Sequence, residues 1–129
     1  MCRIDISLDI AIAEPIPESG DVSNLTFICG VTCERKKNET GKTIQTWKNA
    51  SDLILHLWKR YNEDKVRIVS WNGVKFDFYL LANQPGTNDI EKEYCKFLAK
   101  KHTDIAFAFL AERGYMISLS SAIGRQHEL

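Results

Sequence analysis

The stretch Val69-Ser-Trp-Asn-Gly-Val-Lys-Phe-Asp-Phe-Tyr-Leu-Leu81 carries most of the information about the fold. An apolar strand runs into Asn72-Gly73, where glycine lets the backbone turn sharply, and a helix then opens. Phe76 and Asp77 fall in the first turn of that helix, where a strand end and a helix start expose polar groups. The pattern therefore predicts a strand, a tight turn and a helix. Polar groups are exposed at the edge where the strand ends and the helix begins.

Two readings of this edge remain open. The carboxylate of Asp77 can bind a divalent metal ion through hard oxygen ligands. The flat faces of Trp71 and Phe76 can stack on a base or a sugar. In the alternative reading, Asp77 only favours the helix N-terminus and both aromatic rings belong to the core.

Upstream of this stretch the chain predicts three strands. Residues 3–12 alternate between apolar and polar side chains, which places Asp5, Ser7 and Asp9 together on one face of a strand. A loop with Pro15, Pro17 and Gly20 leads to a second strand over residues 25–33. After a charged hairpin tip at 34–42, a short third strand is expected at 43–47.

The remaining elements alternate between helix and strand. Asn49 is expected to cap a helix that has Asp52 in its first turn and continues to Tyr61. A strand at 66–71 and a helix at about 74–83 follow, then an amphipathic helix that ends at Lys100-Lys101. A further helix is predicted from Asp104 onward. This order favours a single α/β domain with a mixed sheet over residues 1–129.

The composition restricts the kind of partner. The 129 residues include 17 basic and 17 acidic side chains, so the formal net charge is zero and a broadly basic coat for nucleic acid is excluded. A local basic patch remains possible, and the run Arg35-Lys36-Lys37 either contacts phosphate or is a solvated hairpin tip. No apolar run approaches the roughly 20 residues of a membrane helix. Cysteine usage and the absence of an export signal lead us to expect a cytoplasmic location.

The block Asn72-Gly-Val-Lys-Phe-Asp77, followed by Phe-Tyr-Leu-Leu, resembles the second conserved block of the DEDD-type 3′–5′ exonucleases. The resemblance is closest to the exonuclease domains associated with family B DNA polymerases. It implies a ribonuclease H-like fold whose first strand ends in Asp-x-Glu. The order of the elements agrees, and the resemblance covers roughly residues 3–124.

The resemblance implies a site for metal ions and for the terminal nucleotides, and its residues can be assigned one by one. Asp9 is similar to the first metal-binding aspartate, and Asp77 to the metal-binding aspartate of the second block. Asn72 and Phe76 would line the channel for the terminal nucleotides, with Trp71 as a further stacking surface. The implied cofactor is Mg²⁺ or Mn²⁺, and the implied partner is nucleic acid, as single-stranded 3′ ends.

Two departures from the family pattern concern catalysis. The glutamate of the first block would fall at position 11, where this chain has Ala11, and Glu14 has the wrong spacing to replace it. The last block, a Tyr or His followed by an Asp on a final helix, is missing. His102-Thr-Asp104 resembles a weaker His-x-Asp segment and is not expected to be catalytic. With two of the four expected acidic ligands, we expect weak or no turnover unless a partner chain supplies the missing helix.

Three hypotheses follow from the sequence. The leading one is an incomplete, metal-dependent 3′–5′ exonuclease-like domain that acts on nucleic-acid ends. The second is a catalytically dead ribonuclease H-like module that binds single-stranded nucleic acid or a polymerase-like partner. In the third the chain has no role with nucleic acid, Asn72-Gly73 is only a turn, and Asp77 only favours the start of its helix.

Overall fold

A computed structural model describes residues 3–15, 17–19, 21, 24–37, 39–63, 65–70 and 76–105. These residues form five strands and three helices. In chain order they are β1 (Ile4–Ile12), β2 (Phe27–Lys36), β3 (Lys42–Trp47), α1 (Ala50–Tyr61), β4 (Val66–Ser70), α2 (Asp77–Ala82), α3 (Asp89–Lys101) and β5 (Thr103–Asp104). No described helix is long and apolar enough to cross a membrane.

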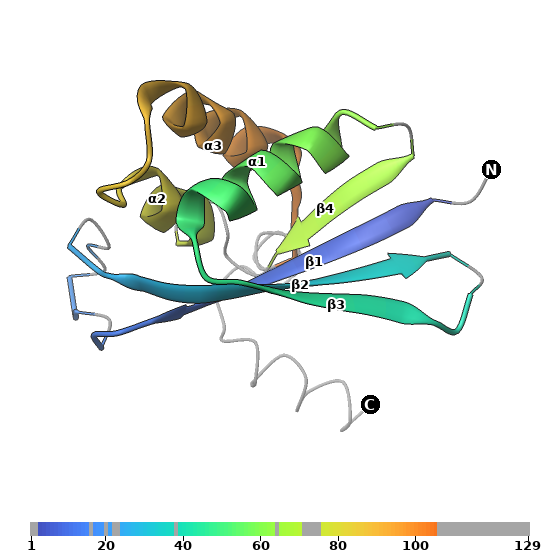
Figure 1. Cartoon of the computed structure of the whole chain (residues 1–129), viewed down its shortest axis with the longest axis horizontal. Helices are drawn as coiled ribbons and strands as arrows, with labels where there is room; N and C mark the ends of the chain where they lie inside the picture. Colours follow the sequence, from blue (N-terminus) through green and yellow to red (C-terminus); the bar gives the residue numbers. More distant parts are fainter. Residues whose placement is uncertain are drawn as a thin grey trace, which may run out of the picture.

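The five strands form one mixed sheet in the order β3-β2-β1-β4-β5. β1 pairs antiparallel with β2, and β2 with β3, as expected for strands joined by hairpin-like turns. β4 lies parallel to β1, and β5 lies parallel to β4, because helices connect these strands. Figure 1 shows α1, α2 and α3 together on one side of this sheet. The predicted α/β class with a mixed sheet is therefore confirmed.

The core lies between the sheet and these three helices. The alternation predicted for the first strand holds, because Ile6 and Leu8 of β1 are buried while Ser7 and Asp9 are exposed. Side chains from five elements make up the main cluster: Ile6, Leu8, Leu53, Ile54, Leu57, Ile68, Phe78, Leu81, Cys95 and Leu98. Removal of this apolar surface from water is the main favourable term in folding. It also leaves the opposite face of the sheet for the polar side chains of β1.

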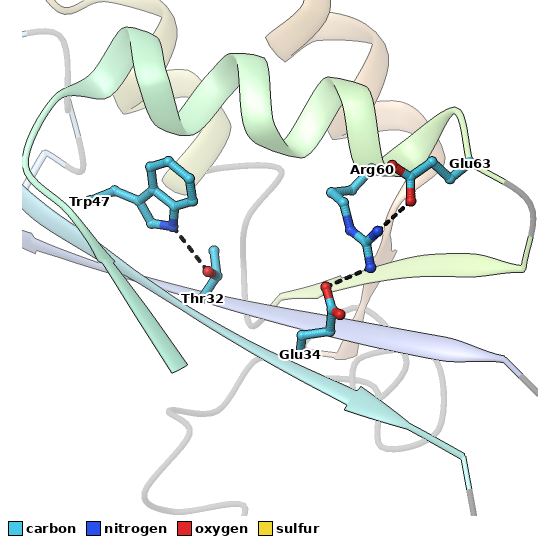
Figure 2. Close-up of polar contacts among 5 residues, drawn as sticks. All are labelled: Thr32, Glu34, Trp47, Arg60 and Glu63. Atoms are coloured by element: carbon cyan, nitrogen blue, oxygen red, sulfur yellow. Dashed lines mark hydrogen bonds and ion pairs between the residues drawn. The ribbon is translucent and has the colours of Figure 1, made fainter. Parts of the chain in front are cut away.

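Helix α1 lies close to β2 because of one glycine and one arginine. A Cβ atom built on Gly30 would come within 2.6 Å of Leu53 Cδ2, so a larger residue at this position would require the buried Leu53 side chain to shift. Arg60, at the other end of α1, donates to the carboxylate of Glu34 on β2 at 2.6 Å and also pairs with Glu63 (Figure 2). Together these contacts set the height and the direction of the helix above the sheet.

The starts of α1 and α3 follow the rules for capping, whereas α2, which follows Phe76, has no side-chain cap. The Asn49 side chain accepts a hydrogen bond from the Asp52 backbone N–H at 3.1 Å, which confirms the predicted cap of α1. At α3, Asn88 and Glu91 form a reciprocal capping box, with bonds of 2.8 and 3.0 Å. Trp47, just before α1, donates its indole N–H to the Thr32 hydroxyl at 3.0 Å (Figure 2).

Some sequence-based boundaries were wrong. The helix predicted from Asp104 begins one residue later: Asp104 ends the short strand β5, because Thr103 and Asp104 pair with Val69 and Ser70 of β4, and Ile105 is helical. The rest of that predicted helix lies outside the described residues. β2 runs to Lys36, three residues beyond the predicted end, since its pairing with β1 continues to Ile4. Helix α2 begins at Asp77. The earlier start predicted near residue 74 lies outside the described residues.

Candidate functional site

Asp9 lies near the end of β1, on the sheet face that points away from the three helices. Its neighbours in the same strand, Ile10 and Leu8, point to the helix side, so the alternation of the strand sets the direction of Asp9. The carboxylate is exposed, and its Oδ1 accepts the backbone N–H of Ile10 at 3.0 Å. Asp9 is therefore accessible to a ligand at the end of the sheet.

Asp77 is the first residue of α2, the helix that follows β4, and β4 is the parallel neighbour of β1. Only 5% of Asp77 is exposed. Phe76, just before it, packs against a small second cluster made by Leu25 and Leu80. Phe76 thus has a packing role, and this packing helps to fix the residue that carries the buried carboxylate.

Burial raises the pKa of Asp77 from an ordinary 3.8 to about 7, with further contributions from the negative charges of Asp9 and Asp104. Carboxylates from β1, α2 and β5 therefore interact electrostatically at one end of the sheet. Such mutual repulsion is relieved by a proton or by a cation. The negative charge of Asp9 therefore acts on Asp77, and the assignment of both to one metal site stays a prediction.

Asp104 is the acidic residue that the sequence analysis set aside. It is 9% exposed at the end of β5, beside Ser70 of β4 in the parallel ladder. The signal was present in His102-Thr-Asp104, but a two-residue strand has no periodicity that could show where its aspartate lies. Its charge acts on Asp77, so we add Asp104 to the candidate site.

His102 ties the start of β5 to β4 and α3. Its Nδ1–H donates to the Leu98 carbonyl at 2.7 Å, and its Nε2 accepts from the Ser70 hydroxyl at 2.6 Å. The ring also lies 4.6 Å from the ring of Phe78, edge to face. Burial lowers the pKa of His102, which keeps the ring in the neutral form that this pair of bonds requires. His102 therefore helps to position the strand that carries Asp104.

The structure also shows what stands at the position of the missing glutamate. Ala11 lies on the same face of β1 as Asp9, two residues further on, and it is exposed. Glu14 does not take its place, because its carboxylate accepts the backbone N–H of Thr26 at 2.6 and 3.2 Å. These hydrogen bonds lower the pKa of Glu14. Glu14 thus joins the end of β1 to the segment before β2.

The described carboxylates have the right chemistry for a divalent cation, but they do not form a complete metal site. Carboxylate oxygens are the ligands that Mg²⁺ prefers, so the chemistry of Asp9, Asp77 and Asp104 suits this cation. Within the described part of the chain, however, no three or more His, Cys, Asp or Glu side chains are arranged to hold a metal ion. Two closely spaced ions would need more ligands than these. We therefore assign no two-metal step to the described residues. Trp71 and Asn72, the other predicted site residues, lie outside them.

Comparison with known proteins adds evidence on the fold. No protein-family model and no curated protein matches the chain. A solved structure of exonuclease I in its apo form is similar over 92% of this chain, with a TM-score of 0.53 and 10% sequence identity. This chain has a ribonuclease H-like fold. A second exonuclease I structure, described as suggesting how processivity is achieved, matches 87% of the chain at 9% identity, with a TM-score of 0.49.

The extent of the match differs between the two proteins. The similarity covers 33% and 31% of the two exonuclease I chains, so this chain spans about a third of their length. At 10% identity the similarity shows the shared arrangement of strands and helices. A shared fold does not by itself determine the activity, which depends on the side chains of the site.

Proposed function

We propose that this chain is a metal-dependent 3′–5′ exonuclease-like domain that acts on the ends of nucleic-acid single strands, with low turnover. The observation that carries the proposal is the interaction of Asp77, buried at the start of α2, with Asp9 on β1, within a ribonuclease H-like fold. Asp9 and Asp77 would hold Mg²⁺ or Mn²⁺, and a bound ion would activate water for attack on the terminal phosphodiester.

The chain's own residues have three roles in this proposal. Asp77 supplies a carboxylate that exchanges its proton for a cation near neutral pH, because its pKa is about 7. Asp104 adds negative charge beside it. Asn72, Phe76 and Trp71 would hold the terminal nucleotides. Low turnover follows from Ala11, since a carboxylate two residues after Asp9 is the ligand that the resemblance leads us to expect.

The test is stepwise shortening of a 5′-labelled single-stranded oligonucleotide in Mn²⁺ or Mg²⁺. We expect a slow ladder from the 3′ end, lost in chelator and in Asp77→Asn. The matched control is Asp52→Asn, which removes one exposed carboxylate at the start of α1 and should leave the ladder unchanged. Absence of shortening at high protein concentration would contradict the exonuclease proposal.

A gain-of-function variant makes the test sharper. Ala11 is exposed on the Asp9 face, so Ala11→Glu adds a carboxylate there without disturbing the core. We expect tighter Mn²⁺ binding by calorimetry and faster shortening than in the wild type. Ala13→Glu is the control, since it adds the same group at an exposed position two residues beyond. Equal Mn²⁺ affinity in both variants would argue against a metal site at Asp9.

A second candidate function is a binding module without catalysis. The observation that favours it is the lack of a complete metal-ligand group among the described residues, together with Ala11. Such a module would bind single-stranded ends or a polymerase-like partner. Binding of an oligonucleotide in chelator by wild type and Asp77→Asn alike, with no shortening in Mn²⁺, is the result expected for it.

A further inference from the structure

A row of charged side chains crosses the sheet face that points away from α1, α2 and α3 (Figure 1), at the end opposite Asp9. Backbone pairing places Lys42, Arg35, Asp5 and Arg67 side by side on β3, β2, β1 and β4. Residues paired in this way project from the same face. Glu34, next to Arg35, points to α1 instead, as its bond to Arg60 shows, so this row lies on the side away from the helices.

The single acid of the row is already paired with two arginines. The Asp5 carboxylate accepts from Arg67 at 3.1 and 3.2 Å and forms an ion pair with Arg3 at 3.1 Å. Arg35 and its neighbours Lys36 and Lys37 are exposed and form no ion pair with another described residue. The positive charge at this end of the sheet therefore exceeds the negative charge.

These side chains line a pocket of about 490 Å³. Its walls are Asp5, Arg35, Lys36, Lys37, Glu39 and Thr40, from β1 and from the connection between β2 and β3. A guanidinium group binds phosphate oxygens through two parallel hydrogen bonds, and an ammonium group acts as a compact positive charge. The Thr40 hydroxyl is a further donor of the kind that contacts a sugar-phosphate backbone.

We propose that this pocket binds the backbone phosphates of the nucleic-acid strand whose 3′ end lies at Asp9. The proposal rests on the proposed function for its choice of ligand. Asp5 and Asp9 lie on the same face of β1, four residues apart, which corresponds to about 13 Å at roughly 3.3 Å per residue. A stacked strand rises about 3.4 Å per nucleotide, so about four nucleotides span that length.

Charge complementarity selects a polyanion as the occupant. The whole chain is neutral, so a local excess of Arg35, Lys36 and Lys37 is the feature that can attract a phosphate backbone. This binding needs no divalent cation and does not read base sequence. It would hold the strand while its 3′ end occupies the other end of the sheet.

The experiment measures binding of a fluorescently labelled ten-nucleotide oligothymidylate in chelator, by anisotropy, over a range of salt. The variant Arg35→Gln/Lys36→Gln/Lys37→Gln removes three positive charges from the pocket. The matched control, Lys59→Gln/Lys96→Gln/Lys100→Gln, removes three exposed charges from α1 and α3 on the other side of the sheet. A conservative variant, Arg35→Lys with both lysines changed to arginine, keeps the charge and should keep the binding.

The expected difference is one of salt dependence. For single-stranded nucleic acid, the logarithm of the binding constant falls with the logarithm of the salt concentration by about 0.7 per phosphate contact. Three contacts therefore account for a slope of about 2. Between 50 and 200 mM salt, the wild type and the control should therefore lose about 20-fold more affinity than the pocket variant. Equal salt slopes in all variants would overturn the proposal.

Two further measurements distinguish a nucleic-acid site from a general polyanion site, and failure of the pocket proposal from failure of the exonuclease proposal. Inorganic tripolyphosphate, at the same phosphate concentration, should compete weakly; full competition would show a general polyanion pocket and overturn the assignment to nucleic acid. Asp77→Asn should bind in chelator like the wild type. If the wild type does not shorten a strand in Mn²⁺ while the pocket variant loses binding, the exonuclease proposal fails and the pocket proposal stands.

Discussion

The burial of Asp77 predicts an unusual dependence of stability on pH. The folded protein keeps the proton of Asp77 up to about pH 7, whereas the unfolded chain loses it near 3.8. Between these values the folded state binds more protons, so the free energy of unfolding falls as the pH rises. Replacement by asparagine, which has the same shape and no charge, should remove this fall.

The magnitude follows from the pKa of about 7. Between pH 5 and about pH 7 the folded protein keeps the Asp77 proton and the unfolded chain has lost it. Each of these roughly two pH units lowers the free energy of unfolding by about 1.36 kcal/mol. We therefore expect the wild type to lose about 3 kcal/mol, relative to Asp77→Asn, over this range. His102 acts in the opposite direction, because its lowered pKa makes stability rise toward pH 6.5. The difference between the two proteins cancels that contribution.

Urea unfolding in chelator, followed by far-ultraviolet circular dichroism at several pH values, measures the effect. With a slope of about 1–3 kcal/mol per molar urea, the midpoint difference between the two proteins should change by about 1–3 M between pH 5 and 8. Asp52→Asn, at an exposed site, should follow the wild type. A difference between wild type and Asp77→Asn that stays constant with pH would refute the burial argument.

Three further variants test the packing of the fold, each by urea unfolding. Gly30→Ala should cost about 1 kcal/mol, because the added methyl group would meet Leu53 Cδ2 at 2.6 Å and the buried Leu53 side chain would have to repack; an unchanged midpoint would contradict the close approach. Asn88→Ala should cost about 1 kcal/mol by loss of the α3 cap, with no change in the pH profile. Trp47→Phe should cost about 1–3 kcal/mol, since the buried Thr32 hydroxyl loses its donor, whereas Trp47→Phe combined with Thr32→Val should recover part of that loss.

The parts of the fold that could be predicted from sequence are those whose signal is local. The alternation in β1 correctly separated Ile6 and Leu8 from Asp5, Ser7 and Asp9, because a strand presents alternate residues to opposite faces. The cap at Asn49 and the amphipathic pattern of α1 were also correct, since both depend on spacings of three or four residues. These features follow from short-range geometry.

The parts that could not be predicted depend on contacts between distant residues. β5 exists because Thr103 and Asp104 find an unpaired edge of β4, more than thirty residues earlier in the chain. Two residues carry no periodicity, so the sequence did not show that a short strand precedes the helical residue Ile105. The same pairing places the charge of Asp104 where it acts on Asp77. The third carboxylate was therefore missed for the same reason as the strand.

The two ends of the β1 face lead to an order of events in the proposed reaction. Asp9 and Asp104, whose negative charges both act on Asp77, would repel a phosphate backbone, whereas Arg35 and its neighbours would attract one. If both proposals hold, a strand without a cation would be held by the basic pocket while its end stays away from Asp9 and Asp77. A divalent cation at Asp9 and Asp77 would change that repulsion to attraction. On this proposal, capture of the 3′ terminus would depend on a cation, whereas binding at the basic pocket would not.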